Sequence, residues 1–213
     1  MLSTVTCITA FLALFGIVYS APASTNHFAG AMGLAGYNIV PIQWELPAKA
    51  DDPNGKKVTV NGTIQEAIAQ MDAGYPGWHR TFEAQLHTDT NNSAPILAAA
   101  AEEPESYDCD IDGDAASQYR IGQGITYLRG LSGTAKNGPG PGNCGRVSCA
   151  YNAAIYWCNE NGFEKEVQWG QIADGGEFVY HNCSTQDWQG VGKAKGQVNY
   201  KDKWNVVVRS ESC

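Results

Sequence analysis

The second half of the chain carries apolar residues at helical spacing in two stretches. These stretches are residues 114–130 and 167–183. Their apolar positions are Ile121, Ile125 and Leu128, then Trp169, Ile172, Ala173, Gly176 and Val179. Asp114 is the expected N-cap of the first helix, and Gly130 is its expected end. The pattern therefore predicts two amphipathic helices, each with one face in a core.

Alternating apolar positions predict strands between and after these helices. Residues 195–200 and 203–209 are expected as strands, and residues 145–159 as mainly strand, although part of that stretch also fits a helical face. Residues 134–143 are expected as a turn-rich loop. This order of elements is typical of an α+β fold with two layers, an antiparallel sheet with helices on one face. A ferredoxin-like split is one version of it.

The first half shows a smaller set of elements. Residues 37–47 predict an extended stretch, residues 56–62 a strand and residues 63–73 a short helix. Thr63 and Glu66 have the spacing of a capping box at the start of that helix. Because so few residues make only a marginal core, we expect 21–87 to be a small accessory region or a pro-region.

Residues 88–105 are small, polar or acidic and include two prolines, which predicts a linker. The cysteine-rich domain is then expected over 106–213.

Residues 1–20 have no charged side chain and an apolar run over 8–18. Small Ser20, with Val18 two residues before it, suits signal-peptidase cleavage before Ala21. A membrane anchor is the alternative, but the apolar run is short for a span, which needs about 20 residues. The pattern predicts a signal peptide and a secreted, extracellular protein.

Cysteine usage follows from this prediction. Cys7 would leave with the signal peptide, and six cysteines would remain. They are Cys109, Cys144, Cys149, Cys158, Cys183 and Cys213. Because secreted cysteines are normally oxidised, three disulfides are expected, with the pairing left open among about 15 possibilities. No thiol would then serve as a nucleophile.

The charge balance bears on the partner. Asp and Glu number 22 against 14 Lys and Arg, a formal net charge of −8. Binding of nucleic acid or of an anionic membrane needs clustered cations, so neither is expected. The sequence contains no G-x-S-x-G, H-E-x-x-H or G-x-x-x-x-G-K-[ST] motif. We therefore expect no cofactor and favour a protein that is not an enzyme.

Four segments together resemble a known group of proteins. They are GITYLRGLSG (124–133), GPGPGNCGRVSCAYNAAIYWCNEN (138–161), WGQIADGGEFVYHNC (169–183) and the ending WNVVVR…ESC (204–213). Together they resemble small secreted cysteine-rich effector-like proteins of filamentous ascomycete fungi. The ending is also distantly similar to fungal killer toxins of the smut-virus type. The resemblance implies secretion, three disulfides and a role outside the cell, and it supplies no catalytic residues.

An acidic run imitates the start of a calcium loop. It consists of Asp108, Asp110, Asp112 and Asp114 at alternating positions, with Gly113 between the last two. The bidentate Glu that such a loop needs at its twelfth position is replaced by Tyr119. We therefore expect no metal, and a solvated acidic stretch that favours the start of the next helix.

Glu177 and His181 are the candidates for an enzymatic alternative. They lie four residues apart on a predicted helix and could mimic, with a nearby Arg, the acid and base of a small ribonuclease-like hydrolase. An ordinary surface ion pair is the simpler interpretation, because such helical pairs are common. An open surface around the pair would argue against the enzyme.

Exposed residues are the candidates for binding. Trp188 lies in the polar stretch STQDWQG and is expected to contact a protein or glycan. Lys193, Lys195, Lys201 and Lys203 form a basic cluster that would suit an anionic partner or protect strand edges. Trp157 and Trp169 are expected in the core.

Glycosylation is expected at Asn61 and Asn91, which begin N-x-[ST] sequons. The sequon at Asn182 contains a cysteine that we expect in a disulfide, which disfavours its modification. We expect a monomer that binds an unidentified extracellular protein or glycan.

Overall fold

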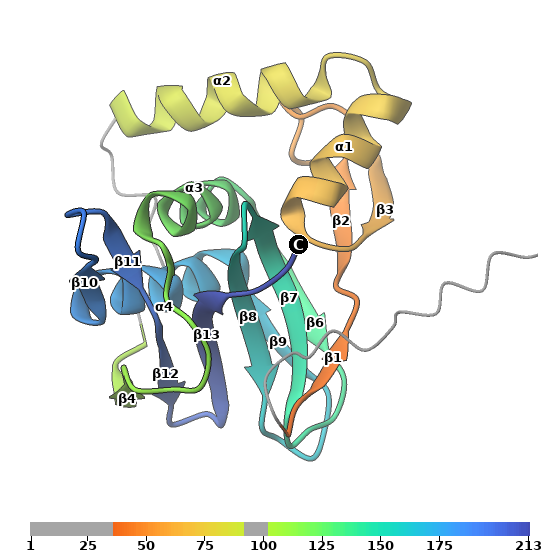
Figure 1. The fold of residues 1–213 in the computed structure, drawn as a ribbon. Coiled ribbons are helices and arrows are strands. Elements are labelled where there is room, and N and C mark those ends of the chain that lie inside the picture. The colour runs from red at the N-terminus through yellow and green to blue at the C-terminus, as the bar shows by residue number, and fades with distance from the viewer. Residues whose placement is uncertain (1–35, 92–101) are drawn as a thin grey trace, which may run out of the picture. The chain divides into compact units, whose positions relative to one another are not determined.

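The structure is a computed structural model that describes residues 36–91 and 102–213. The predicted signal peptide and Cys7 lie outside the described residues, as do residues 21–35 and 92–101. The described residues form a mixed α and β fold of helices and several sheets (Figure 1). They contain four helices and three disulfides.

The four helices are distributed over both halves of the chain. Their bounds are α1 (Ile64–Gly74), α2 (Trp78–Asn91), α3 (Gln118–Arg129) and α4 (Trp169–Asn182). Thr63 is the N-cap of α1, and Glu66 completes the predicted capping box. Sequence analysis missed α2. Its N-terminal amides at Gly77 and His79 are capped by the Asp72 side chain, which lies in the preceding helix.

The largest sheet has six strands. In spatial order they are β1 (Asn38–Val40), β7 (Asn143–Ala150), β8 (Ala153–Asn159), β13 (Trp204–Ser210), β12 (Gly196–Tyr200) and β4 (Pro104–Asp108). All neighbouring pairs are antiparallel except β1 and β7, which are parallel. The expectation of a purely antiparallel sheet is therefore wrong at this edge, because the strand from the first half enters beside β7 in the same direction.

The described residues form three smaller sheets besides the large one. They are β2 (Gln43–Pro47) with β3 (Lys57–Asn61), β6 (Thr134–Asn137) with β9 (Lys165–Gln168), and β10 (Ser184–Gln186) with β11 (Gly192–Ala194) and β5 (Ala116–Ser117).

Several sequence-based boundaries need correction. The predicted linker 88–105 overlaps the end of α2 at Asn91 and the start of β4 at Pro104. Asp114 is not the N-cap of α3, because residues 116–117 pair as β5 and Ser117 directly precedes the helix. The predicted loop 134–143 begins with β6, in which Ala135 and Asn137 are buried. The stretch 145–159 belongs to two strands, β7 and β8, joined by a tight turn at Tyr151 and Asn152.

The large sheet buries side chains on both of its faces. In β8, Ile155 and Trp157 belong to the main hydrophobic cluster, whereas Tyr156 and Cys158 belong to a second, smaller cluster. This alternation follows from the two-residue period of a strand. It explains why every residue of β8 is buried.

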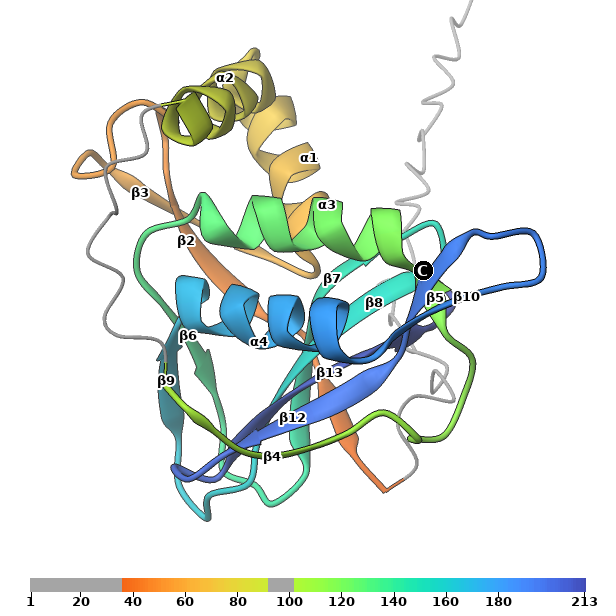
Figure 2. The ribbon, with the colours of Figure 1, turned by 90° about the vertical axis from the view of Figure 1, so that its left-hand side faces the viewer.

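Helices α3 and α4 lie side by side and pack against strands of the large sheet (Figure 2). Gly124 allows α3 to approach β7 closely, since a Cβ at this position would lie 2.5 Å from the Ser148 Oγ. Trp157 and Trp169 are both buried, as predicted.

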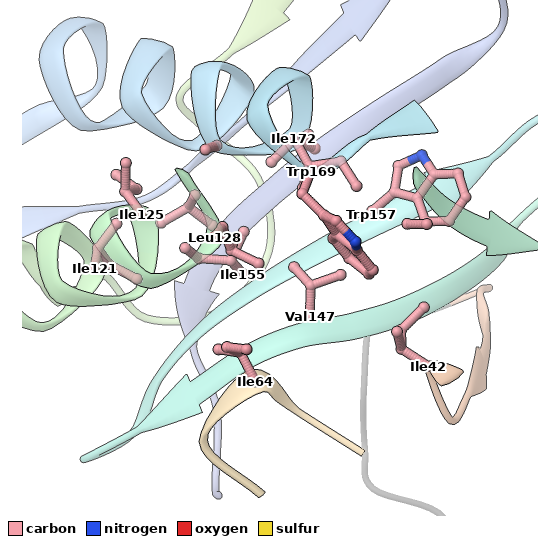
Figure 3. Close-up of a cluster of buried hydrophobic side chains, with 14 of the residues drawn as sticks. Ile42, Ile64, Ile121, Ile125, Leu128, Val147, Ile155, Trp157, Trp169 and Ile172 are labelled. Carbon is pink, nitrogen blue, oxygen red and sulfur yellow. The ribbon is translucent and has the colours of Figure 1, made fainter. Parts of the chain in front are cut away.

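The first half contributes to the same hydrophobic cluster (Figure 3). The ring of Trp44 stacks on that of Trp169, with the centroids 4.0 Å apart. Ile42 lies directly over Gly145, where a Cβ would come within 2.0 Å of the Ile42 Cδ1. Residues 36–91 and 102–213 therefore share one core.

All six cysteines of 106–213 are paired, which confirms the prediction of three disulfides. The pairs are Cys109–Cys183, Cys144–Cys158 and Cys149–Cys213. Among residues 36–91 and 102–213, no helix combines the length and the apolarity needed to cross a membrane.

Candidate functional site

The hairpin of β10 and β11 presents Trp188 to solvent. The Trp188 side chain is 90% exposed, more than any other large apolar residue that the structure describes. Val191, in the same turn, is also exposed. We call residues 184–194 the Trp188 hairpin.

The turn that carries Trp188 is fixed by Asp187. One carboxylate oxygen of Asp187 accepts hydrogen bonds from the amides of Gln189 (3.0 Å) and Val191 (2.9 Å). Gly190 adopts a positive φ of 77°, which glycine tolerates without strain. The hydrogen bond from the Val191 amide, assisted by the Gln189 amide and nearby Lys193, lowers the pKa of the Asp187 carboxyl. The Asp187 side chain therefore holds the turn in one conformation.

The base of the Trp188 hairpin is anchored to the rest of the fold. The Gln118 side-chain amide donates to the Ser184 Oγ at 2.8 Å and to the Tyr180 carbonyl at 3.2 Å. Cys183, directly before β10, is joined to Cys109. On the other side, β11 pairs with β5. The hairpin thus projects from a base held covalently and by hydrogen bonds.

The four predicted lysines do not form one patch. Lys193 lies in the Trp188 hairpin, with its Nζ 3.6 Å from the Asp187 carboxylate. Lys195 donates to the Ile111 carbonyl at 2.7 Å. Lys201 and Lys203 lie in the turn between β12 and β13, at the other end of β12 (Figure 1). Only Lys193 thus belongs to the same hairpin as Trp188.

Glu177 and His181 lie on the exposed side of α4. The Glu177 Oε1 and the His181 Nε2 are 3.9 Å apart, and the two side chains are 47% and 65% exposed. Arg129 of α3 bridges Glu177 and Asp174, with 2.8 Å from its Nη2 to an oxygen of each. The arginine that the hydrolase hypothesis requires is therefore present, but the group is open to solvent.

The acidic run around Asp110 forms a loop tied to neighbouring strands. The Asp108 carboxylate accepts from the Asp110 amide at 2.8 Å, and the Asp114 carbonyl accepts from the Ser210 amide at 2.8 Å. Asp112 is exposed. Among the described side chains, those of 36–87 and 102–213, no group of three or more His, Cys, Asp or Glu residues is arranged to hold a metal ion.

A shallow pocket of about 220 Å³ lies between α1, β7 and the end of the chain. Its lining residues are Thr63, Gln65, Glu66, Ala69, Arg146, Cys149 and Cys213. Both of its charged groups already have partners: Glu66 accepts from the Thr63 amide, and Arg146 donates to the Ser212 carbonyl. Neither Glu177 nor His181 lines this pocket.

No protein-family model, curated protein or solved structure matches this chain. The resemblance to secreted fungal effectors stays a prediction. The functional interpretation therefore depends on the geometry of the surface.

Sequence reasoning did not single out one further exposed group. Tyr119 and Tyr151 are 68% and 75% exposed, and the guanidinium of Arg120 lies over the Tyr151 ring, 3.7 Å from its centroid. Dividing residues 145–159 into two strands would have predicted a turn at Tyr151 and Asn152, and therefore an exposed Tyr151.

The two predicted glycosylation sites are placed at the ends of elements. Asn61 ends β3 and is exposed, whereas Thr63 of the same sequon is buried as the N-cap of α1. Asn91 ends α2, and its side chain lies outside the described residues. Both sites stay predictions.

Proposed function

We propose that this chain is a secreted effector or killer-toxin-like protein that binds a host or competitor target outside the cell, without catalysing a reaction. The observation that carries the proposal is the Trp188 side chain, 90% exposed at the tip of an ordered hairpin. Exposure of the apolar surface of an indole ring to water raises the free energy of the isolated protein. A partner that covers the ring would remove that cost.

Order in the turn supports binding through Trp188. Tryptophan is among the residues that contribute most to protein interfaces when a partner encloses it. Association also loses less conformational entropy when the contact residue is already held in place. The Asp187 hydrogen bonds and the disulfide at Cys183 provide that restraint.

Secretion is supported by the disulfides and by the pattern of residues 1–20. Disulfides persist in oxidising compartments and are rare in the cytosol. We further propose that the scaffold has two layers, with its helices on one face of the sheet, and that it works as a glycosylated monomer.

The test compares two exposed aromatic residues on the purified, oxidised protein. Fluorescently labelled protein is titrated onto intact host or competitor cells, with protease-treated and glycosidase-treated cells in parallel. Trp188→Ala should weaken binding at least about tenfold, which corresponds to about 1.4 kcal/mol. Phe163→Ala is the matched control, because Phe163 is 65% exposed in another loop. Equal binding by the Trp188→Ala variant and the unmodified protein would remove the basis of the proposal.

A ribonuclease-like hydrolase is the second candidate, favoured by Arg129 beside Glu177. In that case Glu177 and His181 would exchange the proton of a substrate hydroxyl, and Arg129 would face the phosphate. RNA cleavage by the purified protein that disappears in His181→Ala would establish it. Absence of cleavage at every pH from 4 to 8, about the range in which carboxylate and imidazole titrate, would reject it.

A further inference from the structure

Tyr119, Arg120, Gln123 and Tyr151 form a connected surface group, which we call the Arg120 site. The Arg120 guanidinium carbon lies 3.7 Å from the centroid of the Tyr151 ring and 5.2 Å from that of Tyr119. Gln123 accepts from the Arg120 Nη1 at 2.8 Å and donates to the Tyr119 hydroxyl at 3.4 Å. The plane of the guanidinium is therefore held in one orientation.

The backbone at Tyr151 is unfavourable for a tyrosine. Tyr151 and Asn152 have φ angles of 52° and 59°, as in the two-residue turns where Asn and Gly are preferred. Large residues adopt this left-handed region rarely. The Tyr151 ring is 75% exposed, so burial does not offset the strain. Strain of this kind at an exposed position indicates a role other than folding.

The charge of Arg120 is contacted by tyrosine rings and by Gln123, but by no described carboxylate. Among the side chains that the structure describes (36–87 and 102–213), no carboxylate forms an ion pair with Arg120, whereas Arg129 contacts both Asp174 and Glu177. Arg120 lies in the first turn of α3, where the helix dipole disfavours a cation. The chain has 22 acidic residues, and none of those described pairs with this group.

We propose that the Arg120 site binds a carboxylate of the partner, an Asp or Glu side chain on an extracellular protein. The guanidinium fork matches a carboxylate in a bidentate geometry, and Gln123 occupies only part of its donors. The rings of Tyr119 and Tyr151 would cover an apolar residue beside that carboxylate. Arginine and tyrosine are typical of protein interfaces, which favours a protein over an acidic polysaccharide.

This inference rests on the proposed function, because it assumes a partner outside the cell. Its own evidence is the contact of Arg120 with the two tyrosine rings. Failure of one is distinguishable from failure of the other. Cell binding is scored with Trp188→Ala, whereas carboxylate binding is scored with Arg120→Gln and a defined probe.

The test follows the NMR signals of the Arg120 Nε–H group and the Tyr151 ring in the full oxidised protein. The probes are a terminally blocked peptide of alternating Glu and Leu, the same peptide with Gln for Glu, and trigalacturonate. The Glu peptide should shift both signals in a saturable way at millimolar concentration, and the Gln peptide should not. Arg120→Gln should weaken the Glu peptide at least about tenfold. Arg80→Gln, at an exposed arginine of α2, should not change its affinity.

Tyr151→Asn separates binding from folding. Asparagine tolerates the positive φ, so the melting temperature should stay within about 4 °C of the unmodified protein while the affinity for the Glu peptide falls. Three results would overturn the inference: no shift with the Glu peptide, equal shifts with the Glu and Gln peptides, or shifts with trigalacturonate alone.

Discussion

Residues 36–91 and residues 102–213 are stabilised in different ways. The three disulfides all lie within 102–213, and residues 36–91 contain no cysteine. Region 36–91 is held to the rest by β1 beside β7, by Trp44 on Trp169 and by Gln65, whose side chain bonds Ser148 and the Cys149 amide.

The difference shows that the disulfides lie in one region, whereas both regions contribute side chains to the shared core. Trp44 and Ile42 are almost fully buried, and they cover Trp169 and Gly145 of the other region. Crosslinks restrict the unfolded chain but do not replace apolar surface that is missing from a core. The disulfide-containing region should therefore depend on a region that has no covalent crosslink to it.

The largest expected effect is the loss of region 36–91. A fragment of residues 102–213 keeps all three disulfides, but it exposes the ring of Trp169 and leaves the β7 edge unpaired. We expect it to lack cooperative thermal unfolding and to bind the dye ANS. Near-UV circular dichroism and calorimetry measure both properties.

A milder change serves as the control for this fragment. Trp44→Ala in the full chain should lower the free energy of unfolding by about 3–5 kcal/mol, as expected for a buried aromatic residue. Adding a separate peptide of residues 36–91 should restore cooperative unfolding of the fragment. A fragment that melts at the temperature of the full chain would show that 36–91 is a removable region.

The second expected effect concerns the disulfides themselves. Cys109–Cys183 and Cys149–Cys213 span 74 and 64 residues, whereas Cys144–Cys158 spans 14. The chain-entropy model assigns about 4 kcal/mol to each long link and about 3 kcal/mol to the short one. Paired Cys→Ala variants, one disulfide at a time, should follow that order in chemical unfolding. If the short link proved the most important, its buried position between β7 and β8 would matter more than chain entropy.

Local elements of the fold could be predicted where one residue pattern decides the structure. The capping box at Thr63 and the apolar face of 167–183 are cases, because their contacts lie within a few residues. The parallel pairing of β1 with β7 could not be predicted, since it joins residues more than a hundred positions apart. Helix α2 was missed because its mean hydropathy is low, and its buried side chains are Trp78, Phe82 and Leu86.

For the residues of the candidate site, the sequence predicted only that their side chains are exposed. The polar neighbours of Trp188 indicated exposure, but not the ordered turn made by Asp187. The spacing of the lysines suggested a patch, which β12 divides by placing Lys193 and Lys201 at opposite ends. The contact of Arg120 with Tyr151 depends on how α3 packs beside the β7–β8 turn, and no local pattern contains that information.

The smallest expected effect lies at the contact between the two regions and depends on pH. The Tyr127 hydroxyl of α3 donates to the Glu83 carboxylate of α2 at 3.3 Å. Partial burial and then the charge of Glu83 raise the pKa of Tyr127 above its ordinary value of about 10. The contribution of this hydrogen bond is therefore fully present below about pH 10 and is lost as the pH rises through the raised pKa.

Tyr127→Phe tests whether this contact holds the regions together. The variant should lose about 0.5–1.5 kcal/mol of unfolding free energy at neutral pH. The loss should shrink above about pH 10, where the unmodified protein also loses the hydrogen bond. Site-resolved NMR of labelled tyrosine should show Tyr127 titrating above the ordinary pKa, and Tyr127 in Glu83→Gln should titrate lower. An ordinary pKa for Tyr127 together with an unchanged variant would mean that the buried side chains of α2 hold it in place without this hydrogen bond. The contrast between the region with disulfides and the region without them would then be sharper.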